Sequence, residues 1–298
     1  MTRRHAGPDG LAIVDKDAGW TSHDVVAKAR GVLGTRKVGH SGTLDPDATG
    51  VLLLGVGRVT RLLRFLGLPA KTYTGVIVLG TATSTLDASG EVTGTWDMDG
   101  VTVGDVRSAA ATLTGEILQV PPMVSAIQVD GRRLHELARD GIEVEREARP
   151  VTVHRFEVGD STDPGCFPIE VTCSSGTYVR SLAADVGTAL GGGAHLRNLR
   201  RTSIGSFAAD QARPVEALTP ETLLSPAEAL RDLDAVIVDA KVATEVAHGR
   251  VLEQDRLGVE GAGPWPVVGE DGTLLAVYEP HRGTTAKPSV VLANATAP

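Results

Sequence analysis

The chain has 298 residues, 42% of them hydrophobic, and this length suits one large domain with a small one better than a single small module. No apolar stretch approaches the length of a membrane span, and the N-terminal MTRRHAGPDG lacks the apolar core of a signal peptide, so the sequence predicts a soluble cytoplasmic protein. The two cysteines, Cys166 and Cys173, have no histidine or cysteine at metal-binding spacing, which predicts neither a disulfide nor a zinc site.

The formal net charge of −8 is unfavourable for binding nucleic acid, so its distribution along the chain matters. Residues 207–298 carry a net charge of −7, whereas residues 1–70 carry +4 and residues 176–206 carry +3. Of the 29 basic residues 23 are arginines, whose guanidinium forks suit bidentate contacts with phosphate. The alternative for any single arginine is an ordinary solvated face.

The first predicted elements are a strand and a helix. Residues 1–9 are expected to form a flexible tail, and LAIVDKDAGW reads as a short strand and a turn. Thr21 or Ser22 then caps an amphipathic helix. The apolar stripe of this helix consists of Val25, Val26, Ala29, Val32 and Leu33.

The segment GHSGTLDPDATGV, residues 39–51, is the most informative part of the chain. Pro46 pushes Asp45 out of the helical region, so this carboxylate stands in a stiff loop directly before an apolar run. One alternative is an ordinary turn aspartate. Another is the DxDxT motif of aspartate-nucleophile phosphatases, but that motif follows a buried hydrophobic strand and here RKVGHSGT precedes it.

The next stretch predicts a helix, a strand and a second helix. RVTRLLRFLG has helical spacing, and its arginines (Arg58, Arg61 and Arg64) form either a solvated face or an RNA contact. KTYTGVIVLG alternates like a strand and carries Tyr73, an aromatic residue in a chain with few of them. TATSTLDASGEV reads as turn material before another strand, and a helix is expected near VRSAAATLTG.

Residues 115–153 join a Pro-Pro break, a short basic helix and a mixed-charge strand. The region is either an RNA-contacting segment or a charged surface hairpin. Its basic helix would contain Arg132, Arg133, His135 and Arg139.

The remaining chain predicts the end of the large domain and a small one. FPIEVTCSS reads as a strand, and Gly176 and Thr177 open a helix that three glycines stop. We expect a catalytic domain over residues 10–206, a linker over 207–235 and a small β-rich domain over 236–298.

Four segments of the chain closely resemble the TruB family, the bacterial synthases that make pseudouridine in the T-loop of tRNA. The resemblance implies an α+β pseudouridine synthase fold with a curved, largely antiparallel mixed sheet. The phrase VAHGRVL resembles the opening of a PUA-type RNA-binding barrel, which implies a PUA-like C-terminal domain. The four segments are residues 39–50, 71–92, 121–150 and 174–201.

The resemblance also implies the site. Asp45 matches the catalytic aspartate, and Arg180 matches the arginine that pairs with it. Tyr73 matches the tyrosine that stacks on the flipped base and helps to remove its C5 proton. Three further residues match substrate-binding positions: His40, which fills the gap left by the flipped nucleotide, and Tyr178 and Leu199, which line the pocket. Each of these residues also has an ordinary structural interpretation. Tyr73 is then a strand tyrosine with one face in the core, Arg180 is a helix arginine paired with a neighbour such as Asp185, and His40 is a surface histidine.

The expected function is therefore isomerisation of uridine 55 in tRNA, by an aspartate and base flipping, with no cofactor and no metal. The expected partner is tRNA, and we expect a monomer that needs neither a guide RNA nor a membrane. An RNA-binding or RNA-folding protein that has kept the pocket is the main alternative from another class.

Overall fold

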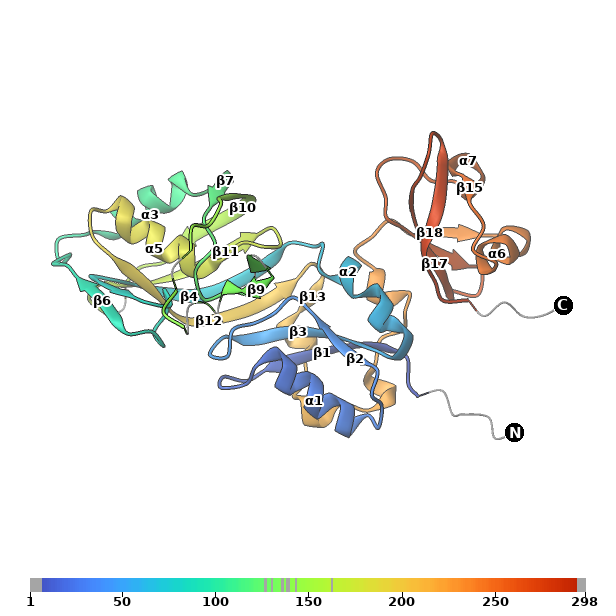
Figure 1. Cartoon of the computed structure of the whole chain (residues 1–298), viewed down its shortest axis with the longest axis horizontal. Coiled ribbons are helices and arrows are strands. Elements are labelled where there is room, and N and C mark those ends of the chain that lie inside the picture. The colour runs from blue at the N-terminus through green and yellow to red at the C-terminus, as the bar shows by residue number, and fades with distance from the viewer. Residues whose placement is uncertain are drawn as a thin grey trace.

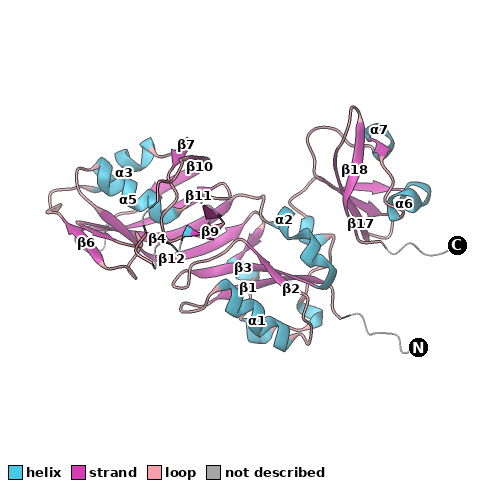
Figure 2. Ribbon diagram, in the orientation of Figure 1, coloured by secondary structure: helices cyan, strands magenta, loops and turns pink. Residues whose placement is uncertain are grey.

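The computed structural model describes residues 7–125, 128–129, 131–134, 137, 140–142, 144–161 and 163–293. Within these residues the molecule has two parts, one built on a large sheet and the other, at the C-terminus, on a smaller sheet (Figures 1 and 2). Of the predicted basic helix, His135 and Arg139 lie outside the described residues, as do residues 1–6 of the expected tail. The tail is tied down at its end, because Asp9 accepts hydrogen bonds from the backbone and side chain of Arg58.

The large sheet follows the order β1-β3-β12-β4-β11-β10-β7 among the described residues, with β2 added to β3 and β13 added to β12. Every pairing in it is antiparallel except that of β12 with β3, so the prediction of a largely antiparallel mixed sheet is confirmed. The strands are β1 (Gly10–Lys16), β2 (Val38–Ser41), β3 (Thr49–Val56), β4 (Lys71–Leu79), β7 (Gly115–Gln119), β10 (Arg149–Val158), β11 (Cys166–Cys173), β12 (Ala194–Ile204) and β13 (Phe207–Ala208).

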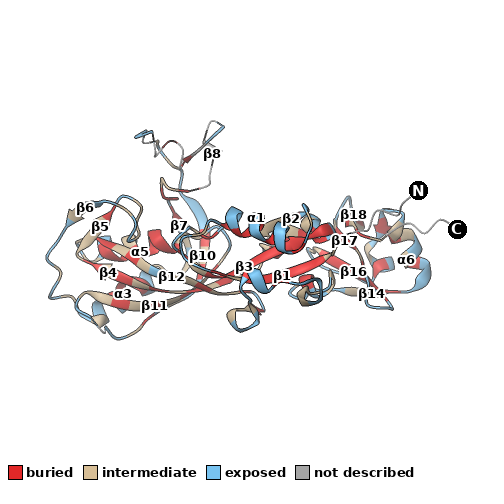
Figure 3. Ribbon diagram, turned by 90° about the horizontal axis from the view of Figure 1, so that it is seen from below, coloured by how far each residue is buried: buried red, intermediate tan, exposed pale blue. Residues whose placement is uncertain are grey.

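Two short hairpins stand outside this sheet. One consists of β5 (Thr81–Thr83) and β6 (Val92–Thr95), and the other of β8 (Gln128–Val129) and β9 (Arg132–Arg133). The segment that carries β8 projects away from the body of the molecule, whereas buried residues follow the sheets (Figure 3).

Three longer helices pack on the large sheet. α1 (Ser22–Val32) begins at Thr21, which forms a capping box with Asp24, as the sequence predicted. α3 (Val103–Thr112) has a similar cap, and it lies beside α5 (Val179–Ala189) over β10 and β12 (Figure 1). The predicted helix over RVTRLLRFLG is instead a 3₁₀ turn, η1 (Gly57–Leu62), followed by the single turn α2 (Leu63–Leu66).

The start predicted for α5, at Gly176 and Thr177, is wrong by two residues. Tyr178 is still extended, with φ −100° and ψ 106°. Its backbone N–H donates to the side chain of Gln119 at 2.8 Å, and the Gln119 amide donates back to the Tyr178 carbonyl at 3.1 Å. A buried glutamine from β7 therefore replaces the local cap that the sequence suggested, and it fixes where the helix begins.

A glycine inside α5 gives a test of this packing. Helix propensity favours Ala over Gly, but a Cβ at Gly187 would lie 2.4 Å from the backbone N of Ala194. We expect Gly187→Ala to lower the free energy of unfolding by about 1–3 kcal/mol, because backbone cannot move aside. Gly31→Ala is the matched control, since a Cβ there meets nothing within 4 Å. This substitution should raise the free energy of unfolding by up to about 1 kcal/mol. Urea denaturation measures both, and equal effects in the two variants would contradict the steric explanation.

Residues 207–235, expected as a linker, run back along the large domain. The backbone of Arg213 bonds to Ile13 and Asp15, and that of Leu224 bonds to Leu11. Leu230 is buried in a core that this segment shares with β1 and β3. The segment contains four short 3₁₀ turns, η2 (Ala209–Gln211), η3 (Val215–Ala217), η4 (Pro220–Thr222) and η5 (Glu228–Leu230).

The C-terminal part is a small sheet with two helices on it, and its strand order is β14-β16-β17-β18-β15 among the described residues. It has a core of its own, to which Trp265 and Tyr278 contribute. Its elements are β14 (Val236–Val238), α6 (Ala240–Ala247), β15 (Leu252–Glu253), α7 (Gln254–Leu257), β16 (Trp265–Gly269), β17 (Leu274–Pro280) and β18 (Thr285–Val291).

Three arginines of η1 and α2 hold the small sheet against the large domain. Arg58 donates to the Leu292 carbonyl at 2.9 Å, and Arg61 donates to the Val291 carbonyl at 2.7 Å. Arg64 pairs with Glu279 at 2.6 Å. Neither alternative from the sequence, a solvated face or an RNA contact, anticipated that these side chains join the two parts of the chain.

Candidate active site

Asp45 lies in a loop between β2 and β3, residues 42–48, which we name the Asp45 loop. The loop is fixed on both sides of the carboxylate. Before Asp45, the backbone N–H of Leu44 donates to the Ser22 hydroxyl at 2.9 Å. After it, the Pro46 carbonyl accepts from the Gly19 N–H at 3.0 Å and from Lys16 Nζ at 2.8 Å. The carboxylate is therefore presented by a rigid turn.

A close backbone crossing explains one glycine of the GHSGTLDPDATG motif. Gly50 has φ +99°, and a Cβ there would lie 2.2 Å from the Arg201 carbonyl oxygen. Only glycine permits β3 to pass β12 at this distance. The strand that leaves the Asp45 loop is thereby joined to the strand that carries Leu199.

Lys16 supports the same loop, which the sequence did not predict. Its ammonium group is buried and donates to the carbonyls of Asp17, Trp20 and Pro46. Burial lowers the pKa of Lys16 to about 8, against the opposing effect of the nearby Asp45 and Asp47 carboxylates. A lysine at the end of an apolar strand was the only available signal.

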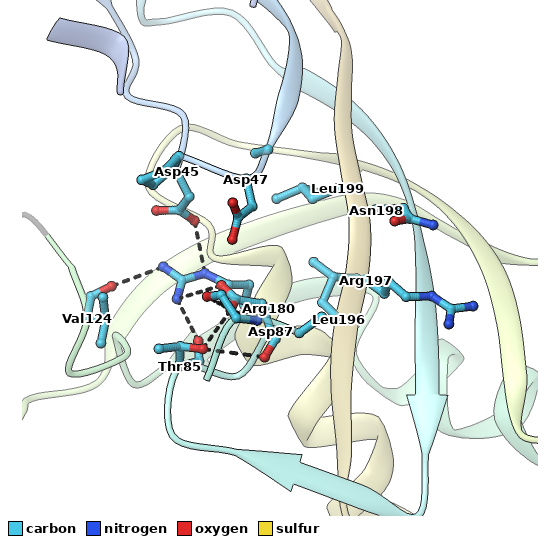
Figure 4. Close-up of a pocket in the computed structure, with 14 residues that line it drawn as sticks. Asp45, Asp47, Thr85, Asp87, Val124, Arg180, Leu196, Arg197, Asn198 and Leu199 are labelled. Carbon is cyan, nitrogen blue, oxygen red and sulfur yellow. Dashed lines mark hydrogen bonds and ion pairs between the residues drawn. The ribbon is translucent and has the colours of Figure 1, made fainter. Parts of the chain in front are cut away.

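Arg180 contacts Asp45, as the sequence predicted. Its Nε lies 3.0 Å from Asp45 Oδ2, and the arginine side chain is only 4% exposed (Figure 4). Its other nitrogens donate to the carbonyls of Thr85 at 2.6 Å and Val124 at 3.0 Å. The guanidinium is thus held from three directions, and its ion pairs are with Asp45 and Asp87 rather than with Asp185.

The Asp45 side chain is 40% exposed, and it lines the cavities described below. Burial raises the pKa of Asp45 above its usual range, and the Asp87 carboxylate raises it further. Arg180 opposes this rise most strongly, and Lys16 adds a smaller effect in the same direction. The ionised form of Asp45 therefore depends on its arginine partner.

Asp87 is a second carboxylate at the site, in a segment that the sequence predicted to be turn material. Asp87 Oδ2 lies 3.4 Å from Arg180 Nη1, and its other oxygen accepts bonds from Thr85 and Ser89. The preceding Leu86 has φ 63°, which is rare outside glycine, and its carbonyl accepts from the Leu196 N–H at 3.0 Å. Docking on β12 holds this turn beside Arg180, and no local pattern reveals that contact.

Two cavities meet at Asp45, Arg180 and Leu199, which line both. The first, of about 210 Å³, is also lined by Asp47, Asp87 and the turn after β5 (Figure 4). The second, of about 290 Å³, is lined by Tyr73, Tyr178, Lys71, Arg201 and the loop before α5, among others. The Asp45 carboxylate thus stands on the boundary between a cavity lined by two further aspartates and one lined by Lys71 and Arg201.

Besides Asp45 and Arg180, three of the residues implied by resemblance line the second cavity: Tyr73, Tyr178 and Leu199. Tyr73 is both a core residue and part of the cavity wall; burial raises the pKa of its phenol, and the Arg201 guanidinium opposes that rise. Tyr178 is held by Gln119. Leu199 follows Asn198, whose φ is 56°, at a bulge where β12 shifts its register against β4.

His40 does not line either cavity. It lies on β2, and its ring meets that of His23 edge to face, with the centroids 5.2 Å apart. Burial lowers the pKa of His40, and His23 and Arg201 lower it further, so its surroundings favour the neutral ring. Its position is beside the site rather than within it.

Metal ligands and membrane-spanning helices were each sought among the described residues. There, no group of three or more His, Cys, Asp and Glu side chains could hold a metal ion. Among the same residues, no helix combines the length and the hydrophobicity that a membrane crossing requires.

The strand before the Asp45 loop, β2, is four residues long and half-buried at its centre, unlike the buried hydrophobic strand that the phosphatase motif requires.

Comparison with known proteins gives matches along the chain. Residues 30–179 match the family described as TruB family pseudouridylate synthase (N terminal domain), and residues 180–243 match the tRNA pseudouridylate synthase B C-terminal domain. The tRNA pseudouridine synthase B of Rhodococcus jostii is 50% identical over 96% of this chain and 95% of its own length. That of Streptomyces coelicolor is 47% identical over 95% of this chain and 97% of its own.

Solved structures share the fold at low sequence identity. A chain from a Cbf5-Nop10-Gar1 complex superposes with a TM-score of 0.74 and 23% identity, covering 99% of this chain and 92% of the other. A chain from an archaeal box H/ACA sRNP Nop10-Cbf5 complex gives 0.73 and 22%, with 99% and 90% covered. At this identity the likeness concerns the fold alone.

Proposed function

The chain belongs to the TruB family of pseudouridylate synthases, and from this premise we propose that it converts uridine 55 in the T-loop of tRNA to pseudouridine. The observation that carries the proposal is the ion pair between Asp45 and Arg180, which presents a carboxylate to a cavity of nucleoside size. An isomerase of this kind rearranges one nucleoside and consumes no cofactor. It would work as a monomer in the cytoplasm, without a guide RNA.

The reaction breaks the N1–C1′ bond of uridine, turns the freed base and rejoins it through C5. The base must first leave its stack, because a folded RNA loop hides these atoms. Asp45 is the group we assign to the reacting centre, and a carboxylate suits attack at C1′, addition at C6 or removal of a sugar proton. In each case it acts ionised, and the contact with Arg180 supports that state.

The second cavity is the place we assign to the flipped base. Tyr73 would stack on the ring and help to remove its C5 proton, and stacking of a base on an aromatic side chain contributes about 1–3 kcal/mol. Tyr178 and Leu199 would close the other sides of the cavity. We assign to His40 the gap that the nucleotide leaves, because it stands beside the cavities on the neighbouring strand.

The domain boundaries that we propose remain residues 10–206 for the catalytic domain, 207–235 for a connecting segment and 236–298 for a PUA-like tRNA-binding domain. Hydrophobic residues of the last, Val277 among them, share a core with Leu11 and Leu62. Deleting it would therefore expose apolar surface of the catalytic domain. Point substitutions are the better test of its contact with tRNA.

Salt dependence tests whether basic segments follow the RNA backbone. We expect tRNA affinity to fall steeply between low and moderate salt, because each neutralised phosphate releases counterions. Arg36→Gln removes an exposed charge next to β2 and should reduce the slope of log affinity against log salt by about one. Arg61→Gln is the matched control and should leave the slope unchanged, because its guanidinium is bound to the small sheet. An affinity that is flat with salt would contradict the proposed binding mode.

The activity itself is tested by release of tritium from C5-labelled uridine in tRNA, in the presence of EDTA. Release of tritium together with formation of pseudouridine at position 55 supports the proposal. Tight binding of tRNA without release would identify an RNA-binding or RNA-folding protein. Release that EDTA abolishes would point to a metal-dependent reaction instead.

A further inference from the structure

Two cationic side chains are buried together in the wall of the second cavity. Lys71, the first residue of β4, is 5% exposed, and Arg201, on β12, is 1% exposed. Both line the cavity that also contains Asp45 and Tyr73. They converge on Gly42 of the Asp45 loop, where a Cβ would lie 3.5 Å from both Arg201 Nη1 and Lys71 Cε.

Backbone carbonyl groups hold these two charges, and the Arg201 guanidinium also lies over the Tyr73 ring, 6.0 Å from its centroid. Lys71 Nζ donates to the Gly67 carbonyl at 3.0 Å, and Arg201 donates to the carbonyls of Val51 and Gly42 at 2.7 and 3.0 Å. Within the described part of the chain, neither forms an ion pair with a carboxylate. The adjacent Arg200, in contrast, forms a bidentate pair with Asp15.

The groups around the two cations do not neutralise them. Asp45 lies in the same cavity, but its charge is matched by Arg180. Cys173, opposite Lys71 in the register of β4 and β11, is a buried thiol whose pKa is raised to about 11. Burial and Arg201 lower the pKa of Lys71 to about 8, so its ammonium is still charged at pH 7. Burying like charges without a counter-ion is costly, so the cavity is prepared for an anion.

The buried position distinguishes between two kinds of anion. An RNA phosphate keeps most of its water and meets exposed arginines and lysines, whereas these two side chains are buried in the wall of the cavity. A base inside the cavity becomes negative only as the reaction proceeds. A preorganised charge in a site that excludes water stabilises such a state far better than water does.

We propose that Lys71 and Arg201 stabilise the negative charge that develops on the uracil ring when its bond to C1′ breaks. The electron pair of the N1–C1′ bond remains on the base, which becomes an anion, and C1′ is left electron-deficient until it accepts a new pair. When C5 bonds to C1′, the base supplies the electron pair and loses its negative charge. C5 then loses its proton, the ring double bonds return to their original pattern, and N1 gains a proton, so no electrons are gained or lost overall. The inference rests on the proposed function and adds two charge-stabilising residues to it.

The inference is tested by comparing uridine with 5-fluorouridine as the reacting nucleoside. Fluorine at C5 withdraws electrons, so the anion of 5-fluorouracil is more stable and needs less help. We expect Lys71→Met to slow the conversion of uridine in a T-loop RNA by about 10- to 100-fold. The same variant should slow the loss of N1-linked 5-fluorouridine by only a few-fold. Single-turnover reactions at pH 7, followed by nuclease digestion and mass spectrometry, measure both losses.

Three further variants separate charge from structure. Lys71→Arg keeps the charge and should restore most of the uridine rate. Lys71→Gln removes the charge but keeps a donor for the Gly67 carbonyl. It replaces Lys71→Met in the comparison of the two substrates if thermal melting shows that Lys71→Met is not folded. Lys16→Met is the matched control: it removes another buried lysine with a pKa of about 8, but one that holds the Pro46 carbonyl and does not line the cavities. It should slow both substrates by the same factor.

The outcomes are distinct. A defect at Lys71 that is equal for uridine and 5-fluorouridine, or no defect at all, overturns the inference while leaving the proposed function intact. A wild-type protein that makes no pseudouridine overturns the proposed function itself.

Discussion

Asp45→Asn is expected to lower pseudouridine formation on the order of a thousandfold or more, because an amide cannot supply the charge of a carboxylate to the reacting centre. The substitution preserves shape, and the amide oxygen of the introduced asparagine would still accept the 3.0 Å hydrogen bond from Arg180 Nε. The loss should therefore reflect chemistry rather than a collapsed site. Single-turnover tritium release measures it.

Binding separates this prediction from a general loss of function. We expect the affinity of the Asp45→Asn protein for tRNA to stay within a few-fold of wild type, since phosphate contacts supply most of the affinity. Asp47→Asn, a change in the same loop without the contact to Arg180, should cost much less activity. Isomerisation near the wild-type rate in Asp45→Asn would remove Asp45 from the reacting centre.

Arg180→Met is expected to have the second largest effect. It keeps the apolar stem and deletes the guanidinium that pairs with both Asp45 and Asp87. The pKa of Asp45 is already raised by burial, and Arg180 is the main group that counteracts this rise. Without it the pKa rises further, so less of the carboxylate is ionised at pH 7 and the rate falls by on the order of a hundredfold or more.

The pH dependence of activity should shift in a definite direction in the Arg180→Met protein. In the proposed reaction the ionised form of Asp45 is the active one, so activity should be lost as the pH falls through the pKa of Asp45. A raised pKa moves that loss to higher pH, so the Arg180→Met protein should recover part of its rate as the pH is increased above that needed by wild type. Arg180→Lys retains a charge and should show a smaller displacement. Full activity with an unchanged pH profile in Arg180→Met would mean that Arg180 only supports the fold.

The sequence by itself determined the features that depend on neighbouring residues. Strict alternation in KTYTGVIVLG identified β4, and Thr21 with its apolar stripe identified α1, because strand and helix periodicity are local properties. The stiff Asp-Pro loop and the resemblance to the TruB family identified the fold, which is confirmed, and pointed to Asp45 and Arg180, which do lie in contact.

Only the tertiary structure decided which distant side chains meet. Asp87 lies in a turn that looks ordinary until it docks on β12 beside Arg180. Gln119, on β7, determines where α5 begins, and Arg61 donates a hydrogen bond to the small sheet instead of facing solvent or RNA. Lys71 and Arg201 form a pair only because β4 and β12 are neighbours in the sheet. Local propensity acts over a few residues, whereas these contacts depend on the strand order and register of the folded chain, which no short stretch of sequence contains.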